Sequence, residues 1–526
     1  MGKPCILAID LGTSAVKVAL VGAEDGQVLA RETEEYPLAL LPDGGAEQNP
    51  DDWWAAIRAA TGRLWQGGAA DPADVRGIGC TAQWSGTVPV DERGAALSAA
   101  IIWMDSRGAR HVKAVTGGWP SVAGYGAGKL VRWLRKTGGI PAASGKDSIA
   151  HILYLKAERP DLYRRAACFL EPKDYLNARL TGRLAATIDS IALHWVTDNR
   201  DIEKVRYDEG LLRAAGIERR QLPEILRSTE IVGELREAAA RDLSLPPGIP
   251  VAGGSPDIQS AAVGSGATGD YEAHLYIGTS SWLTCHVPLR KTDIAHNMAT
   301  LPSAIPGRYF VANEQETAGA CLQFLRDKVF FHADPLGAGE GREDAYRRFD
   351  EAAEQAPPGA GGVVFTPWLY GERTPIEDHL VRGGFHNVSL DTDRTHLVRA
   401  VLEGVALNSR WLLQAMDGFT GRRLDPIRCI GGGARSDTWC QIQADVLGRT
   451  VAQVEAPLEA NVRGAAAIAS VALGLARFDE LAAGVKVRKA YHPREETQAV
   501  YARTFAAYRD IYRQNRRIYA RLNGQR

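Results

Sequence analysis

The stretch Ile9-Asp10-Leu11-Gly12-Thr13-Ser14 joins two apolar runs of strand character, Cys5–Ile9 and Val16–Val21. The same tripeptide returns in Tyr276-Ile277-Gly278-Thr279-Ser280, again between two apolar runs. A glycine at such a turn lets the backbone approach an anion, and the following hydroxyls and amides can donate hydrogen bonds to phosphate oxygens. The repetition predicts two related domains that hold one polyphosphate from opposite sides.

Length and charge narrow the class of protein. A chain of 526 residues is too long for one hydrophobic core, so two domains of about 250 residues are the simplest division. The formal net charge is −1, whereas a nucleic-acid binder carries a basic patch. We therefore expect no nucleic-acid partner.

Cysteine usage and hydropathy indicate where the protein works. The seven cysteines form no Cys-x-x-Cys pair and lie mostly in apolar runs, which is typical of reduced thiols. Asp10 interrupts the first apolar run early, so this run is expected to be a strand and not a signal peptide. The alanine-rich segment 464–476 is too short to span a bilayer. We expect a cytoplasmic protein with no membrane partner.

Strand and helix patterns alternate in the first half. Val16–Val21, the turn signal Glu24-Asp25-Gly26 and residues 28–30 predict a β-hairpin. Asn49 suits the N-cap of a helix that runs to about residue 65, with a proline in its first turn.

The chain changes character at Leu245-Pro246-Pro247-Gly248, where prolines and a glycine interrupt it. This predicts one domain over residues 1–248 and another over 249–526. Strands and helices repeat in the second half, and aromatics at helical spacing in 501–522 predict a helix packed on the core. The predicted fold class is α/β, with the ligand site between the domains.

Several short motifs follow one another along the chain. They are Asp10-Leu11-Gly12-Thr13-Ser14, Trp103-Met104-Asp105-Ser106-Arg107, Pro172-Lys173-Asp174-Tyr175-Leu176, Gly253-Gly254-Ser255-Pro256-Asp257, the segment 367–375 and the glycine-rich segment 431–445. With this set the sequence resembles the FGGY carbohydrate kinase family over nearly its whole length, and within it most resembles the xylulose kinases. The resemblance implies two ribonuclease-H-like domains of the actin/Hsp70 type around a central cleft.

The same resemblance implies the reaction: ATP and Mg²⁺ are used to phosphorylate a hydroxyl of a small-molecule sugar or polyol. A pentulose such as D-xylulose is the first expectation, with another ketose, a tetritol or a polyol as alternatives. A homodimer is one option for the assembly. A nucleotide-switched binding protein of the actin/Hsp70 type, which shares the phosphate clamp but transfers nothing, is the more remote alternative.

Asp257 is the expected general base, because this aspartate of the family motif takes the proton of the sugar hydroxyl. It follows a glycine pair that ends a strand, so its carboxylate is expected to point into the cleft. The alternative from the residues alone is that Asp257 only caps the helix that begins near Ile258. Asp10 is the expected magnesium-positioning carboxylate, and its alternative is a turn-forming residue.

The phosphates and the adenosine are expected to meet three glycine-containing turns. In the family these turns correspond to Gly12, Thr13 and Ser14 from the first domain, Gly278, Thr279 and Ser280 from the second, and Gly432, Gly433 and Ala434 at the adenosine. Tight turns with no ligand are the alternative for each. Lys17 is expected either to reach phosphate or to face solvent.

The sugar pocket implied by the resemblance consists of Gln83, Trp84, Ser85, Trp103, Asp105 and Asp257. This chain departs from xylulose kinases, which typically have Met and His where Trp84 and Ser85 stand. Trp84 offers a flat apolar face to sugar C–H groups and Ser85 one short hydroxyl. Ile258 replaces an amide after the base. These changes leave the identity of the acceptor open.

Overall fold

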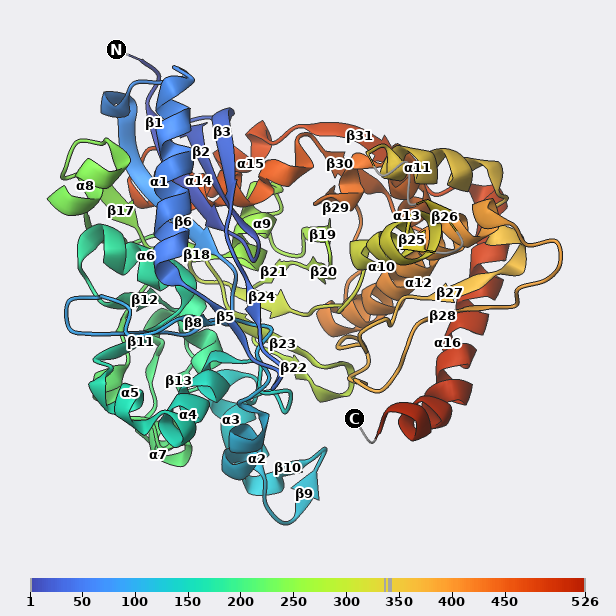
Figure 1. Ribbon diagram of the computed structural model, residues 1–526, viewed down its shortest axis with the longest axis horizontal. Coiled ribbons are helices and arrows are strands. Elements are labelled where there is room, and N and C mark those ends of the chain that lie inside the picture. Colours follow the sequence, from blue (N-terminus) through green and yellow to red (C-terminus); the bar gives the residue numbers. More distant parts are fainter. Residues whose placement is uncertain (1, 335–336, 339–342, 525–526) are drawn as a thin grey trace.

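The computed structural model describes residues 2–334, 337–338 and 343–524. Two lobes lie side by side, one from the first half of the chain and one from the second (Figure 1). A mixed sheet with the strand order β16-β17-β6-β1-β2-β3, and β18 beside β6, is the centre of the first lobe. Its strands are β1 (Cys5–Leu11), β2 (Ala15–Gly22), β3 (Val28–Glu35), β6 (Val75–Ala82), β16 (Ile231–Glu234), β17 (Pro250–Ala252) and β18 (Ser255–Pro256).

The predicted hairpin and the first helix are present. β1, β2 and β3 pair antiparallel, whereas β6 pairs parallel with β1. The first helix, α1 (Pro50–Gln66), begins where the sequence indicates, because the Asn49 side chain accepts a hydrogen bond from the Asp51 amide at 3.1 Å. Its buried side chains, Trp53, Ile57, Ala60 and Leu64 among them, pack on one face of the sheet.

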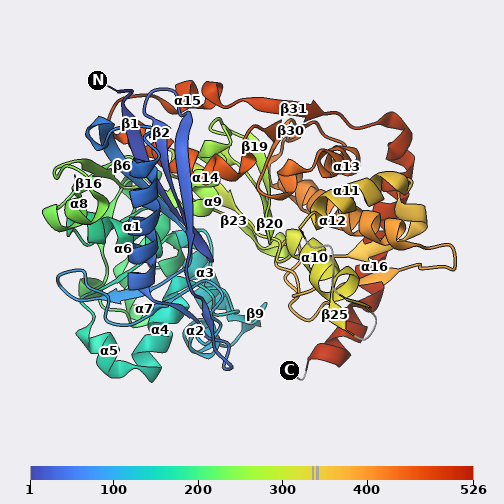
Figure 2. The ribbon, with the colours of Figure 1, turned by 45° about the horizontal axis from the view of Figure 1, so that its top comes forward.

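The other face of the first sheet is covered by a helix from the second half of the chain. α14 (Ala460–Ala472) packs Val462 and its alanines on the apolar side chains of β1 and β2. Figure 2 shows this orange helix beside the blue strands and next to α9 (Asp257–Gly264). The two helices cross at contact distance, because a Cβ on Gly464 would lie 1.8 Å from the Ser260 carbonyl oxygen. Only glycine permits this crossing.

The second lobe repeats the plan of the first. β19 (Ala273–Ile277) pairs antiparallel with β20 (Ser281–Thr284) and parallel with β29 (Ile427–Ile430). β30 (Val451–Val454) and β31 (Val487–Tyr491) complete the sheet. A further sheet, of β21 (His286–Val287), β22 (Thr292–Asp293), β23 (Met298–Pro302) and β24 (Tyr309–Ala312), touches the first lobe, where Leu301 joins its helical core.

The remaining elements surround these sheets. The other helices are α2 (Ala109–Thr116), α3 (Ala127–Thr137), α4 (Ser148–Glu158), α5 (Pro160–Arg165), α6 (Pro172–Thr181), α7 (Glu209–Ala215), α8 (Glu237–Leu243), α10 (Gly319–Phe324), α11 (Ala345–Gln355), α12 (Arg394–Thr420), α13 (Asp437–Leu447), α15 (Phe478–Gly484) and α16 (Glu495–Asn523). The shorter strands are β4 (Ala39–Leu40), β5 (Ala46–Gln48), β7 (Val88–Val90), β8 (Ala100–Ile101), β9 (Ser121–Val122), β10 (Tyr125–Gly126), β11 (Cys168–Leu170), β12 (Ala185–Thr187), β13 (Thr197–Asp198), β14 (Arg206–Tyr207), β15 (Glu224–Leu226), β25 (Ala333–Asp334), β26 (Gly337–Ala338), β27 (Val364–Thr366) and β28 (Gly384–His386).

Several further sequence expectations can be compared with this fold. In α16, Tyr501, Phe505 and Tyr508 are buried in the second core, so the aromatic stripe is core packing. The division at residue 248 stays a prediction, although β17 and β18, which follow it, pair with β6 inside the first sheet. None of the helices in the described part of the chain combines the length and apolar character that a bilayer crossing requires. All seven cysteines are buried and free.

Candidate active site

Three neighbouring parallel strands bring polar residues to one edge of the first sheet. Asp10 of β1 lies opposite Thr81 of β6, and Thr81 lies opposite Ser255 of β18. The carboxyl ends of parallel strands are where α/β folds bind ligands. Within the described residues, the buried Thr81 hydroxyl has no hydrogen-bond partner, and neither does the side-chain oxygen of Gln83, which follows β6.

Asp257 begins α9 directly after β18, at this same edge. One of its carboxylate oxygens accepts a hydrogen bond from the Ile258 amide at 2.8 Å. Burial raises the pKa of Asp257 to about 7; the carboxylates of Asp10 and Glu314 also raise it, whereas the Ile258 amide and Lys17 lower it. A carboxyl group that titrates near neutral pH is suited to accept a proton from an alcohol.

Asp10 is almost completely buried, at 2% exposure, and its carboxylate has partners from both halves of the chain. Lys17, its register partner on β2, lies 3.1 Å from one oxygen. The side-chain amide of Asn461, on α14, lies 3.3 Å from the other. Lys17 therefore points toward Asp10 and not away into solvent.

The first Gly-Thr-Ser turn is joined to the expected sugar residues by side-chain hydrogen bonds. The Trp103 indole donates to the Thr13 hydroxyl at 3.0 Å. The Gln48 amide donates to the Thr13 carbonyl at 2.6 Å and accepts from the Gln83 amide at 2.7 Å. The Tyr36 hydroxyl donates to the Gly12 carbonyl. This network holds the turn, Trp103 and Gln83 in one rigid group, while the Ser14 side chain stays exposed.

The two glycine turns of the second lobe lie next to each other, because Tyr276 pairs with Ile430 across β19 and β29. Gly431 has a φ of 89°, and a Cβ there would lie 2.6 Å from the Ile277 carbonyl. Gly432 faces open space, with nothing within 4 Å of its ideal Cβ, while Ala434 is buried. The Tyr276 ring stacks on the Trp282 ring, with their centroids 3.9 Å apart, and lies against Gly278. Thr279, the next residue, is exposed.

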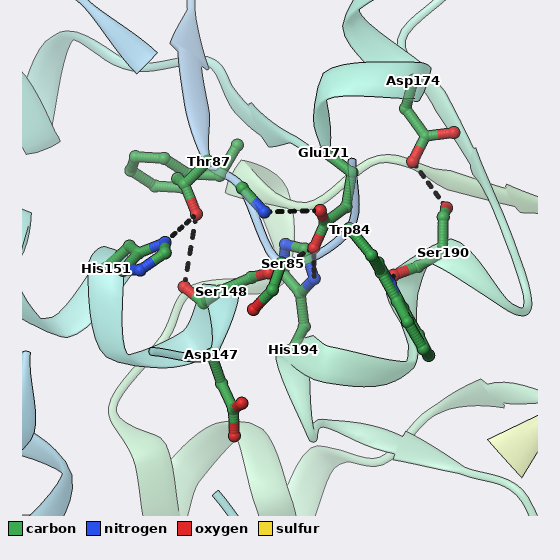
Figure 3. A network of polar contacts seen from close by, with 12 residues as sticks. Trp84, Ser85, Thr87, Asp147, Ser148, His151, Glu171, Asp174, Ser190 and His194 are labelled. Carbon is green, nitrogen blue, oxygen red and sulfur yellow. Dashed lines mark hydrogen bonds and ion pairs between the residues drawn. The ribbon is translucent and has the colours of Figure 1, made fainter. Parts of the chain in front are cut away.

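Trp84 and Ser85 belong to a network of polar contacts in the first lobe (Figure 3). The Trp84 indole donates to the Ser190 carbonyl at 3.0 Å, and its ring packs against the cluster of the second lobe that contains Ile258. The Ser85 hydroxyl donates to the Lys146 carbonyl at 2.6 Å, and the next amide, of Gly86, donates to Glu171. Trp84 therefore touches both lobes, whereas the Ser85 hydroxyl already has a protein acceptor.

Asp105 is buried, at 1% exposure, and its carboxylate accepts several hydrogen bonds. The Ala46 amide donates to it at 3.0 Å, and the Arg107 guanidinium donates two bonds to the same oxygen, at 2.9 and 2.6 Å. The role of Asp105 in sugar binding stays a prediction, and the contacts described here connect it to Arg107 and β5.

Comparison with known proteins identifies the family of this chain. The family model for the N-terminal domain of the FGGY carbohydrate kinases matches residues 5–264, and that for the C-terminal domain matches residues 273–473. The chain belongs to the FGGY family of carbohydrate kinases. The resemblance seen in the sequence motifs and the α/β two-domain fold are thus confirmed.

The names of individual relatives of this FGGY kinase refer to different acceptors. A xylulose kinase of Staphylococcus epidermidis is 27% identical over 524 residues, which cover 99% of each chain. A gluconokinase of Bacillus subtilis is 25% identical over 503 residues, 94% of this chain and 93% of the relative. A crystal structure described as a xyloylose kinase from Brucella ovis has a TM-score of 0.85 and 25% identity, covering 98% of this chain and 100% of its own.

A charged group in the second lobe of the kinase was not among the predicted site residues. Arg373, in the loop after β27, donates to Glu316 at 3.0 Å and to Glu314, and both carboxylates lie between β24 and α10. Burial raises the pKa of Glu314, while Arg373 and a hydrogen bond from Ser280 lower it. The segment 313–317, with two acidic residues just after a strand, was the signal that could have indicated this group.

Proposed function

We propose that this kinase transfers the γ-phosphoryl group of ATP to a hydroxyl of a pentulose such as D-xylulose, with Asp257 as the general base. The observation that carries the proposal is Asp257 itself, at the start of α9, beside the Asp10 carboxylate and with its pKa raised to about 7. A base that titrates near the working pH takes a proton efficiently from an alcohol that attacks a phosphoryl group. Another ketose, a tetritol or a polyol remains the alternative acceptor.

The glycine turns would hold the nucleotide. Gly12, Thr13 and Ser14 would meet the γ-phosphate, Gly278, Thr279 and Ser280 the other phosphates, and Gly432, Gly433 and Ala434 the adenosine. The adjacency of the two turns in the second lobe and the open space at Gly432 support this placement. Preorganised backbone amides stabilise developing charge without a reorganisation cost.

Mg²⁺ fits the residues at Asp10. Across the described residues there is no cluster of three or more His, Cys, Asp or Glu that could cage a metal. Mg²⁺ needs none, because it is typically held by one or two carboxylates, water and substrate phosphates. Asp10 would position the ion, and the ion would neutralise phosphate charge. Lys17 and Asn461 hold the Asp10 carboxylate in place.

The acceptor is expected to lie between Trp84 and Asp257. Trp84 supports this position because its ring packs on the cluster that contains Ile258, the residue after the base. Gln83 and Trp103, held in one network with Thr13, would line the same region. The xylulose kinase relatives support a pentulose, and the gluconokinase relative keeps a sugar acid as a competitor.

A screen of sugars, polyols and sugar acids with ATP, read by coupled ADP detection, tests the proposal. We expect turnover with D-xylulose or a closely related neutral acceptor. ADP release that no small hydroxylated compound stimulates would refute it. We further propose a cytoplasmic location, which the free, buried cysteines support. Assembly as a homodimer stays a prediction.

A further inference from the structure

Lys146 lies beneath the turn that contains the expected sugar residues. Its backbone carbonyl accepts the hydrogen bond of the Ser85 hydroxyl, and it immediately precedes Asp147, the N-cap of α4. Its ammonium lies over the Tyr370 ring of the second lobe, 5.2 Å from the ring centroid. The side chain therefore extends from the first lobe toward the second.

The ammonium of Lys146 has no hydrogen-bond or ion-pair partner among the described residues, although burial lowers the pKa of this lysine. Other lysines of the first lobe are paired: Lys173 with Asp174, and Lys136 with Asp198 and Asp208. Lys146 is half-buried, and partial desolvation of a charge without an ionic partner is costly. A bound ligand could supply the missing partner.

The charged groups that face Lys146 belong to the second lobe. Glu316, Arg373 and Glu314 all act electrostatically on it. Glu314 also acts electrostatically on Asp257 and accepts from Ser280, so its charge influences both Lys146 and the base. Both carboxylates are paired with Arg373, but the Glu314 side chain is 22% exposed, whereas that of Glu316 is only 4% exposed.

Acidic groups outnumber cationic ones in this part of the structure. Lys146 and Arg373 are cationic, Glu314 and Glu316 carry carboxylates, and Asp257 adds a further acidic group. A sugar acid would bring one more carboxylate toward three existing acidic groups. A neutral polyhydroxylated acceptor adds no charge, and its hydroxyls can accept from an ammonium and donate to a carboxylate.

Resting on the proposed function, we infer that Lys146 and Glu314 are specificity-determining residues that bind oxygens of a neutral polyhydroxylated acceptor and select against sugar acids. Lys146 donates to a hydroxyl or carbonyl oxygen of the acceptor, and Glu314 accepts from a neighbouring hydroxyl. The acceptor is thereby held by one residue of each lobe.

The test compares Lys146→Met with Lys129→Met, using D-xylulose, erythritol and D-gluconate as acceptors. Lys129 is a matched control, because it is a half-buried lysine of the same lobe that donates to the Gly117 carbonyl. We expect Lys146→Met to raise the KM for the neutral acceptor about 10- to 100-fold, as for loss of a charged hydrogen bond. The KM for ATP and kcat should change less than about threefold, and Lys129→Met should behave as wild type.

A second variant, Glu314→Gln, tests the inference even if the Lys146→Met protein does not fold. It should raise the KM for the neutral acceptor and narrow the preference for it over D-gluconate by at least about tenfold. An unchanged acceptor KM in both variants, or a wild type that prefers D-gluconate, would overturn the inference. A wild type that phosphorylates none of the three acceptors, nor any other compound of the screen, would instead overturn the proposed function, and the inference with it.

Discussion

Replacement of Asp257 by Asn distinguishes two roles of this residue, that of a general base and that of a cap for helix α9. The side-chain oxygen of Asn can still accept the hydrogen bond that the Ile258 amide donates, so the start of α9 is retained. The ability to take a proton is lost. We therefore expect Asp257→Asn to reduce kcat by at least about 10³-fold while the KM for ATP stays within about threefold.

The raised pKa of Asp257 gives this prediction a pH dependence. In the wild type, kcat/KM should fall tenfold per pH unit below pH 7, because only the ionised carboxylate accepts a proton and its pKa is about 7. At pH 6 about one tenth of the limiting rate should remain. The measurement is a pH–rate profile by ADP detection, with buffers of constant ionic strength.

The same pKa predicts an effect on stability. The folded chain holds the Asp257 proton up to about pH 7, whereas an unfolded chain releases it near the ordinary value of 3.8. The free energy of unfolding should therefore fall as pH rises from about 4 to 7, by at most about 4 kcal/mol for this group. Asp257→Asn removes that loss, so the variant should be more stable than the wild type at pH 8 and similar to it at pH 4.

Urea unfolding of both proteins at pH 4.5 and pH 8 measures the difference. A wild-type rate that stays flat down to pH 5, together with equal stability of the two proteins at pH 8, would refute the assignment of a neutral-range base to Asp257. Asp257→Ala is a useful companion, because it loses the acceptor for the Ile258 amide as well as the base.

Three further changes test other parts of the structure. Gly464→Val should destabilise the protein by about 3 kcal/mol, because its Cβ would lie 1.8 Å from a carbonyl oxygen. The control Gly62→Ala, with nothing within 4 Å of the added Cβ, should be neutral or slightly stabilising. Equal effects of the two substitutions in thermal unfolding would show that α9 and α14 do not pack tightly where they cross. Trp103→Phe removes the donor to the Thr13 hydroxyl and should lower kcat/KM about fivefold. In a double-mutant cycle with Thr13→Val, the two losses of kcat/KM should be non-additive. Additive losses would exclude coupling between these residues. EDTA should abolish turnover, and added Mg²⁺ should restore it. Asp10→Asn should raise the Mg²⁺ concentration that gives half-maximal rate at least about tenfold. An unchanged Mg²⁺ dependence in this variant would show that Asp10 does not position the ion.

Local features of the fold could be predicted from the sequence. The Asn49 cap, the start of α1 at Pro50 and the hairpin of β2 and β3 depend on residues close in the chain. The motifs indicated the family because they occur together and in the family's order along the chain. The motifs also indicated Asp10 and Asp257 as candidate site residues, and the strand pairing places both at one edge of the first sheet.

Contacts between distant segments were not predictable from a single sequence. Nothing near α14 in the chain indicates that its alanines cover β1 and β2. The engagement of Asp105 by Arg107 follows from a turn geometry that the motif does not specify. Lys146 lies in a segment without any motif, and its relation to Glu314 appears only when the two lobes are placed together.

The position of α14 has a consequence for how the polypeptide matures. A fragment that stopped at residue 264 would contain β1, β2 and β6 but would leave Ile6, Ala8 and Val21 bare on one side, since their cover is synthesised almost 200 residues later. One face of the sheet in the amino-terminal half emerging from a ribosome thus stays uncovered until nearly the whole chain is made.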